Sequence, residues 1–410
     1  MKTITADEFW KLPKNKEAEE IDTVRLMLED IRLRGEEAVN KYSQKFDSQK
    51  PYQVTKNEIK EAYKKIDRPT LKAIKEAARR IKDFSKAQFR QIKPFEIKMN
   101  GAVLGQKVIP LNSAGCYVPG GRYPLPSTAL MCTIPAKVSG VKEVIVCSPK
   151  IAPVTIVASD IAGADKIFCI GGVQAIAAMA YGIGIIPKVD KIVGPGNKYV
   201  AAAKKQVYGA AGIDFVAGPS EVLIIADDSA KTTYIAADLL AQSEHDVSAR
   251  PFLVTTSQKV ASETGKEIER QLKQLSTKET AAKALENGYM ILCKNIKEAI
   301  EVANSIAPEH LEIQTKKPEK IIRKLVNYGS LFIGENSAEV FGDYCSGTNH
   351  TLPTSGAARY TSGLSPKDFI KTPTYQQISK KGLAKMKQIA CALATIEGLQ
   401  AHKRAAEIRH

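Results

Sequence analysis

Residues 342–350 bring a carboxylate, a phenol and an imidazole together in one short segment. These groups belong to Asp343, Tyr344 and His350, and glycine and serine lie between them. This composition predicts a loop that gathers ligands or acid–base groups at one centre. Histidine is scarce, with five in 410 residues, so its recurrence beside oxygen-bearing side chains favours a metal or acid–base site. The alternative for each histidine is a hydrogen-bonded structural role.

Gln242 and His245 are three residues apart, in or just after a predicted helix. This spacing places both side chains on one helix face. Together with Asp343 and His402 they form a credible N/O ligand set for a catalytic zinc ion. Glutamine is an uncommon zinc ligand and HExxH is absent, so the spacing alone also fits a helix cap or an exposed amide.

Glu309 and His310 precede a strand-like run. A neighbouring carboxylate and imidazole at the mouth of a strand could act as two separate bases, and a surface dipeptide is the alternative. Ser220 could anchor a ligand, but a GxSxG elbow is absent, so no hydrolase triad is predicted. Neither GxGxxG nor a P-loop occurs. Nucleotide binding is therefore not indicated by these motifs.

The bulk composition indicates a soluble globular protein. A chain of 410 residues predicts two or three domains. The net charge of +16 is mixed along helices with acidic residues, which favours a solvated surface over a nucleic-acid site. The charge-free run 167–187 contains several glycines and favours a buried strand and helix over a membrane span. Seven cysteines without CxxC spacing, and a charged start without a signal peptide, predict reduced thiols in the cytoplasm.

Hydrophobic periodicity divides the chain into four regions. Residues 1–100 are predicted to form a helical N-terminal arm. Residues 101–217 and 218–340 alternate short apolar strands with helices, which predicts two α/β domains with parallel sheets and Gly-rich turns at strand ends. Residues 341–410 are predicted to form a ligand-bearing loop and a helical tail.

The motifs, taken together and in order, resemble the histidinol dehydrogenase family. The matching segments are GCYVPGGRYPLPSTALM, GGVQAIAAMAYG, VDKIVGPGNKYV, AGPSEVLIIAD, LLAQSEHD, APEHLEI, GDYCSGTNHTLPT and EGLQAHKRA. They run from about residue 115 to residue 405, and a series of this length is far more specific than any one motif. Cys345 and the Arg122–Tyr123 pair are local variations that leave the proposed ligands intact.

The resemblance implies a fold, a reaction and a set of site residues. It implies two related, incomplete Rossmann-like domains with helical extensions, working as a homodimer with shared active sites. It implies oxidation of L-histidinol to L-histidine through a bound aldehyde, with two NAD⁺ and one Zn²⁺ per subunit. The implied zinc ligands are Gln242, His245, Asp343 and His402; the implied catalytic pair is Glu309 and His310; the implied cofactor contacts are Tyr117, Gln174 and Asn197; and further substrate contacts are Ser220, Tyr344, His350 and Glu397.

Other functions remain as alternatives. A zinc amidohydrolase with Glu309 as base needs no Gly-rich dinucleotide turns, and a basic nucleic-acid-binding module leaves the His/acid groups unexplained. Related enzymes acting on other amino alcohols or sulfonates are closer competitors. Cys116 could carry the aldehyde as a thiohemiacetal, but Glu309 supplies a water route without it. We expect Glu397 and His402 to reach the active site of the neighbouring subunit.

Overall fold

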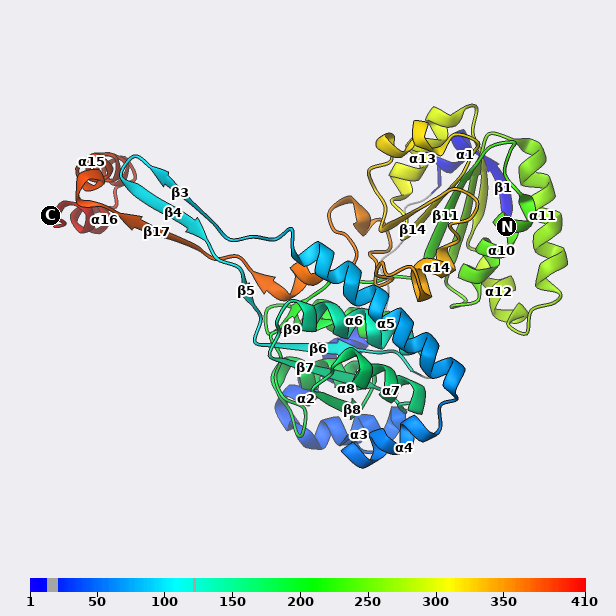
Figure 1. Ribbon diagram of the computed structural model, residues 1–410, viewed down its shortest axis with the longest axis horizontal. Helices are drawn as coiled ribbons and strands as arrows, with labels where there is room; N and C mark the ends of the chain where they lie inside the picture. The colour runs from blue at the N-terminus through cyan, green and yellow to red at the C-terminus, as the bar shows by residue number, and fades with distance from the viewer. Residues whose placement is uncertain (13–20, 121–122) are drawn as a thin grey trace.

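The computed structural model describes residues 1–12, 21–120 and 123–410. Two sheets of parallel strands, each covered by helices, form two halves, and a thin antiparallel ribbon carries a helical tail away from both (Figure 1). The α/β class with parallel sheets is therefore confirmed. Gly121 and Arg122, in the predicted Gly-rich loop, lie outside the described residues.

The first half is built on a sheet with the strand order β10-β9-β6-β7-β8-β2. Its strands are β2 (Tyr52–Gln53), β6 (Ser113–Tyr117), β7 (Glu143–Ser148), β8 (Lys166–Cys169), β9 (Lys191–Val193) and β10 (Gly212–Ile213). All neighbours are parallel except β2, which is antiparallel to β8. In β7, Ile145 and Cys147 enter one core while Val144 and Val146 enter another. Both faces of this sheet are thus buried, as parallel sheets require.

Helices cover each face of the first sheet. They are α2 (Ile21–Arg34), α3 (Glu36–Asp47), α8 (Gly172–Tyr181) and α9 (Lys198–Val207) on one face, and α5 (Arg68–Phe89), α6 (Pro126–Val138) and α7 (Pro153–Ala162) on the other, with α4 (Lys56–Lys64) against α7. The charge-free run 167–187 contains all but the first residue of β8 and the whole of α8, and it is largely buried in the first half. Among the described residues, no helix combines the length and apolar content that crossing a bilayer requires.

The second half is built on a fully parallel sheet with the order β1-β13-β12-β11-β14-β15. Its strands are β1 (Lys2–Thr5), β11 (Glu221–Ala226), β12 (Arg250–Thr255), β13 (Tyr289–Leu292), β14 (His310–Gln314) and β15 (Ser330–Ile333). The helices are α1 (Ala6–Phe9), α10 (Thr232–Ser243), α11 (Gln258–Leu272), α12 (Lys278–Leu285), α13 (Ile296–Ile306) and α14 (Glu339–Tyr344). Ile235 and Leu239 anchor α10 on the sheet because both are fully buried in the core that α10 shares with β11.

The two halves share one strand order. Apart from the edge strands β2 and β1, each sheet has five parallel strands, and the first of these five along the chain, β6 or β11, lies in the middle with the next two strands on one side and the last two on the other. Successive strands along the chain are therefore placed first on one side of β6 or β11 and then on the other, so the strand order reverses at these two strands. In sheets of this kind the reversal point opens a crevice at the carboxyl ends of the strands.

The first hundred residues are distributed differently from the predicted helical arm. Residues 2–5 form β1, which pairs with β13 at the edge of the second sheet, whereas α2 to α5 cover the first half. Residues 102–106 form β4, which belongs to the ribbon and not to the first α/β half. Short, exposed edge strands carry little hydrophobic periodicity, which is the signal used to place the boundaries.

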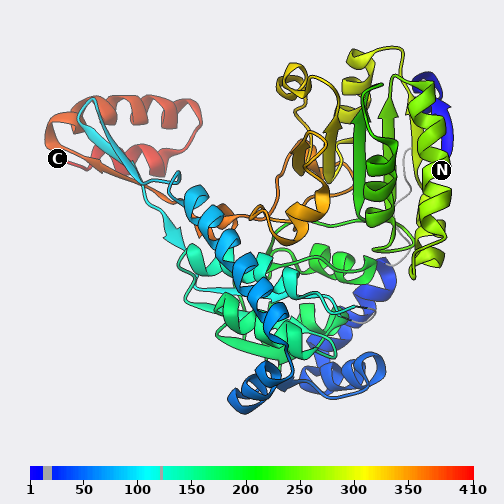
Figure 2. The ribbon, with the colours of Figure 1, turned by 45° about the vertical axis from the view of Figure 1, so that its right-hand side comes forward.

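The ribbon and tail form a projection that we call the arm. It consists of β3 (Phe95–Met99), β4 (Ala102–Gln106), β17 (Thr374–Ile378), α15 (Lys380–Ile396) and α16 (Gln400–Glu407). Figure 2 shows that α15 and α16 stand at the far end of the ribbon, away from both halves. Before the ribbon, β16 (Ile370–Lys371) pairs with β5 (Ile109–Pro110) on the first half. This pairing ties the base of the arm to the first half.

Candidate active site

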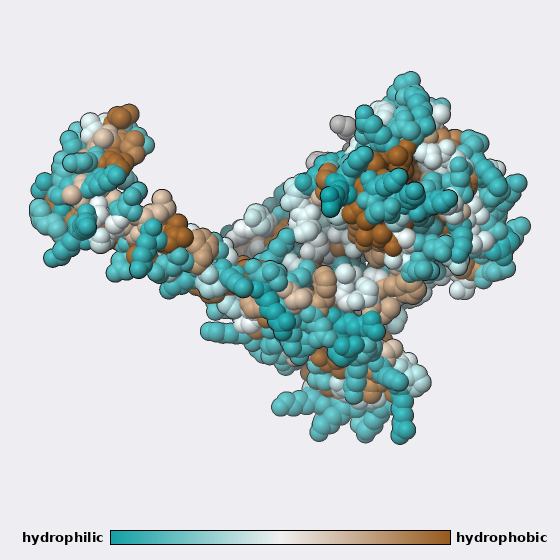
Figure 3. All heavy atoms as spheres, turned by 45° about the horizontal axis from the view of Figure 1, so that its top comes forward, coloured by the Kyte–Doolittle hydropathy of each residue, from teal (hydrophilic) through white to brown (hydrophobic). Residues whose placement is uncertain are grey.

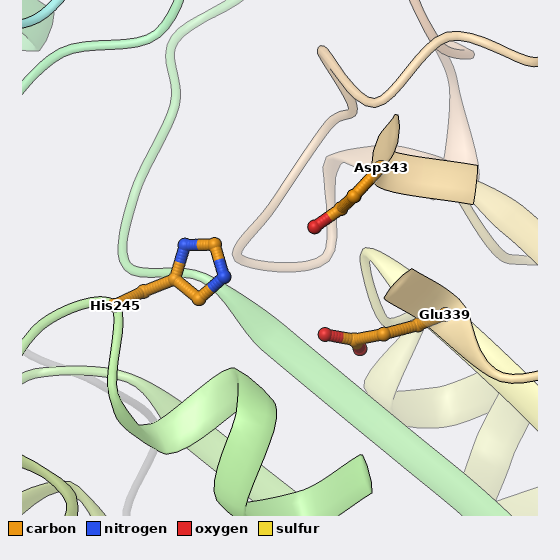
Figure 4. A group of neighbouring side chains, drawn as sticks. All are labelled: His245, Glu339 and Asp343. Carbon is orange, nitrogen blue, oxygen red and sulfur yellow. The ribbon is translucent and has the colours of Figure 1, made fainter. Parts of the chain in front are cut away.

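Acidic and imidazole groups meet where the end of α10 lies beside the short helix α14. His245 follows α10, while Glu339 and Asp343 lie one turn apart on α14 and therefore share a helix face. One ligand atom from each of these three residues lies within 4.8 Å of the other two. In Figure 4 the imidazole and the two carboxylates point toward a common centre. Asp343 and Tyr344 therefore lie on a short helix, so the prediction of a loop at these two positions was wrong.

Glu309 and His310 lie beside this cluster, at the amino-terminal edge of the second sheet. His310 is the first residue of β14, and its neighbour in the adjacent strand β11 is Val222. The register places Glu309 next to Glu221, whose backbone N–H donates to Glu309 Oε2 at 2.8 Å. Arg250 in turn binds the Glu221 carboxylate at 3.1 Å. The buried Glu309 carboxyl group is thus held by the strand pairing itself.

The hydrogen bonds of His310 fix which ring nitrogen can act as a base. Nδ1 lies 3.0 Å from the carbonyl oxygen of Glu221, and a carbonyl only accepts, so Nδ1 carries a proton. The Gln242 amide nitrogen is also 3.3 Å from Nδ1, but the Glu339 oxygens lie closer to that amide. Nε2 is buried, has no hydrogen-bond partner among the described residues and lies 3.6 Å from Asp343 Oδ1. Nε2 is therefore the ring nitrogen available to exchange a proton.

Burial and mutual charge shift the acidities in this cluster. Burial raises the pKa of Glu309 to about 8, although the positive charge of His310 opposes the shift. Burial alone would lower the pKa of His310, but the surrounding carboxylates outweigh it and raise that pKa well above its usual value. Burial would likewise raise the pKa of Asp343, but three nearby histidines hold it at about 2. Asp343 is therefore ionised at neutral pH, close to His310 Nε2.

Proteins of one family match this chain along almost its full length. The histidinol dehydrogenase family model matches residues 11–410. A histidinol dehydrogenase from Methanocaldococcus jannaschii is 46% identical over 419 residues, covering 100% of this chain and 97% of the relative. One from Methanococcus maripaludis is 47% identical over 395 residues, covering 95% and 93%. The chain belongs to the histidinol dehydrogenase family. The crystal structure of a histidinol dehydrogenase from Elizabethkingia anophelis has the same fold, with a TM-score of 0.93 at 37% identity, covering 100% of this chain and 96% of that one.

The donor set of this histidinol dehydrogenase family member fits a divalent metal. His245 is exposed on its turn, while Glu339 and Asp343 are buried beside it. Gln242, from the last turn of α10, is 1% exposed and lies within hydrogen-bond distance of Glu339. Imidazole, amide and carboxylate donors suit zinc and similar ions. A cation here would also compensate the negative charge that the buried carboxylates bring together.

Three other predicted substrate residues lie near the cluster. Tyr344 follows Asp343 directly and is 56% exposed. His350 joins the two halves: its Nδ1 lies 3.0 Å from the Asp343 carbonyl oxygen and its Nε2 lies 3.3 Å from Thr128 Oγ1 on α6. Ser220 is half-buried directly before β11. The junction between the halves therefore borders the cluster.

The predicted cofactor residues all lie at the carboxyl edge of the first sheet. Tyr117 ends β6, and its hydroxyl accepts the Gly172 N–H at 3.1 Å. Gln174, in the first turn of α8, is fully buried and donates to Asp47 at 3.2 Å. Asn197 is exposed and caps α9. All three side chains thus make hydrogen bonds within the protein, and Asn197 is the one that is also exposed to solvent.

Two predicted site residues do not join the cluster within this chain. Glu397 ends α15 and His402 lies in α16, so both lie on the arm, far from α10 and α14 (Figure 1). Both are exposed. The chain alone therefore brings together Gln242, His245 and Asp343, but not the fourth implied ligand.

Glu339 is a site residue that the sequence analysis missed. It is fully buried and stands one helical turn before Asp343. The i,i+4 spacing of the two acids was the available signal, and reading residues 339–344 as a helix would have placed both on the same face.

Proposed function

We propose that this chain oxidises L-histidinol to L-histidine through a bound aldehyde, using two NAD⁺ and a zinc ion, as a cytoplasmic enzyme of histidine biosynthesis. The observation that carries the proposal is the position of His310 Nε2. It is a buried imidazole nitrogen without a hydrogen-bond partner among the described residues, between Glu309 and the candidate metal ligands. Because the chain belongs to the histidinol dehydrogenase family, L-histidinol is the substrate proposed for this site.

His310 is the proposed base for the alcohol proton. Its Nδ1–H is held by the Glu221 carbonyl oxygen, so Nε2 presents a lone pair when the ring is neutral. As the carbinol carbon gives up a hydride, Nε2 accepts the hydroxyl proton, and the products are the aldehyde and a protonated ring. The same nitrogen accepts a proton again when the aldehyde hydrate is oxidised.

Glu309 is the proposed base that activates water for the aldehyde step. Its carboxyl group is 3.7 Å from His310 Nδ1 and is 7% exposed. Water adds to the aldehyde carbon, its proton passes to Glu309, and the former carbonyl oxygen takes a proton from the protonated His310 ring, which forms the hydrate and leaves Nε2 free to accept a proton in the second oxidation. A pKa near 8 makes Glu309 a much stronger base than an exposed glutamate.

The two bound groups are assigned to opposite halves. Gln242, His245, Asp343 and His402 would hold zinc, which when bound orients the imidazole and amine of the substrate while NAD⁺ accepts the hydride. Tyr117, Gln174 and Asn197 would border NAD⁺ at the carboxyl edge of the first sheet. The shared strand order supports describing the halves as related, incomplete Rossmann-like domains.

A homodimer with shared active sites accounts for the arm. Every residue of β3 and β17 is exposed. Large apolar side chains on the arm are also exposed, among them Phe95, Ile389, Leu393 and Ile396, and apolar surface is visible there in Figure 3. Exposed apolar surface of this kind marks an interaction site. In the proposed dimer the arm carries Glu397 and His402 to the cluster of the partner.

The test is the number of NADH molecules formed per L-histidinol consumed, before and after zinc is removed with a chelator. We expect two NADH per histidinol, loss of turnover without metal, and recovery with zinc. A folded, zinc-loaded sample that does not oxidise histidinol would overturn the substrate assignment. Turnover that survives complete metal removal would overturn the role of zinc.

A further inference from the structure

Gln242 lies between the candidate metal ligands and a carboxylate that the family assignment leaves without a role. Gln242 is 1% exposed near the end of α10, and Glu339 is fully buried at the start of α14. An amide has two chemically different ends, and only its oxygen is a metal ligand. The orientation of this amide therefore decides whether Gln242 can bind a cation.

The neighbours of Gln242 fix that orientation. A carboxylate has only acceptor oxygens, so the end of the amide that faces Glu339 must be the nitrogen. In this orientation the amide nitrogen lies 2.9 Å from Glu339 Oε2 and 3.0 Å from Oε1. Because the two arms of an amide diverge from one carbon, the oxygen is then directed away from Glu339.

The backbone of Glu339 is itself held in place. Its backbone N–H donates to the buried Glu312 Oε1 at 2.9 Å. Glu312 also accepts from Gln314 Nε2 at 3.0 Å, and the same nitrogen reaches Asp238 Oδ2 on α10 at 3.1 Å. The start of α14 is thus fixed relative to α10, the helix that carries Gln242.

From this geometry we propose that Glu339 is a positioning residue, which holds the amide nitrogen of Gln242 so that the amide oxygen is the atom presented to the metal. The inference rests on the proposed metal site. Outer partners of this kind typically change metal affinity about 10- to 100-fold when removed. Glutamate suits the role better than glutamine because a second amide could satisfy Gln242 in either orientation.

A charge-exchange cycle tests the inference through zinc affinity, measured by competition with a chromophoric chelator. Glu339→Gln removes the carboxylate that fixes which end of the Gln242 amide faces residue 339, and it should weaken zinc binding about 10- to 100-fold. Gln242→Glu places a carboxylate against Glu339 and should also weaken binding through like-charge repulsion. The double variant restores one donor amide facing one carboxylate, so it should bind zinc more tightly than either single variant. Circular dichroism of each protein monitors folding.

Other outcomes overturn the inference. If Glu339 binds the metal directly, Gln242→Glu should bind zinc at least as tightly as the parent, and adding Glu339→Gln should weaken it. Unchanged affinity in Glu339→Gln also overturns the positioning role. Should Glu339→Gln fail to fold, the weaker binding expected of Gln242→Glu alone remains decisive. A parent protein that binds no zinc would instead remove the proposed metal site.

Discussion

Lys204 on α9 forms a buried ion pair whose loss should destabilise the first half. It is 1% exposed, its ammonium group pairs with the Asp214 carboxylate, and it donates to the Gly194 carbonyl oxygen at 2.7 Å. The Asp214 side chain is fully buried and accepts the backbone N–H groups of Gly194 and Phe215 at 2.8 and 2.7 Å. Lys204→Met keeps the apolar stem but leaves the Asp214 charge without its counter-ion.

The expected loss is about 3–5 kcal/mol, because breaking a buried pair leaves an uncompensated charge. With a urea m value of about 3 kcal/mol/M for a domain of this size, the unfolding midpoint should fall by roughly 1–2 M. The assay is urea unfolding followed by circular dichroism. NAD⁺ affinity provides a second readout, because Gly194 begins the turn that leads to Asn197.

Two variants make the measurement decisive. Lys205→Met changes the exposed neighbour on the same helix and should alter stability by less than about 0.5 kcal/mol. Lys204→Met/Asp214→Asn removes both charges, and the amide oxygen can still accept one of the two N–H groups, which bind different oxygens of Asp214, so the double variant should recover part of the loss. A Lys204→Met protein as stable as Lys205→Met would refute the reasoning, as would a double variant with no recovery.

Three further predictions concern catalysis. The pKa of Glu309 is raised to about 8 and that of His310 is also raised, so both bases lose their protons only as pH rises. We therefore expect kcat/KM for L-histidinol to increase between about pH 6 and pH 9. A value of kcat/KM that falls over this range would contradict these roles. Cys116 is buried in β6, where burial raises its thiol pKa, so Cys116→Ala should retain both oxidation steps; selective loss of the aldehyde step in a folded variant would favour the thiohemiacetal route. Mixed dimers of His402→Ala and Gln242→Ala chains should regain about a quarter of the parent activity, since half of the dimers are mixed and each mixed dimer has one intact site; mixtures as inactive as each variant alone would exclude site sharing.

Sequence periodicity predicts the two halves well because their elements are buried on regular faces. The helix Thr232–Ser243 and the strands Lys191–Val193 and Ser330–Ile333 lie in the two regions for which the sequence predicts alternating strands and helices. By contrast, residues 2–5 form an edge strand of four residues with a largely exposed pattern. Residues 95–99 form an arm strand that is exposed throughout. Neither strand has a buried face to produce the alternation that marks a strand.

The candidate site was predictable only through the order of its motifs. Gln242 and His245 have ordinary helical spacing, and Glu309–His310 alone resembles a surface dipeptide. Their meeting depends on the pairing of β11 with β14 and on the contact between α10 and α14, which are long-range features without a local signal. Glu339 was missed because burial of an acid at a helix start cannot be read from its immediate neighbours.

The proposed sites lie at opposite edges of two similarly ordered sheets, so their helices offer opposite partial charges. Around the proposed cofactor residues, α8 begins without a side-chain cap and α9 begins at Asn197, and the N–H groups at helix starts attract phosphate. At the acidic cluster α10 ends, and the free carbonyl groups of a helix end attract cations. In the proposed arrangement, one folding pattern used twice would place helix starts near the dinucleotide and a helix end near the metal and the substrate amine.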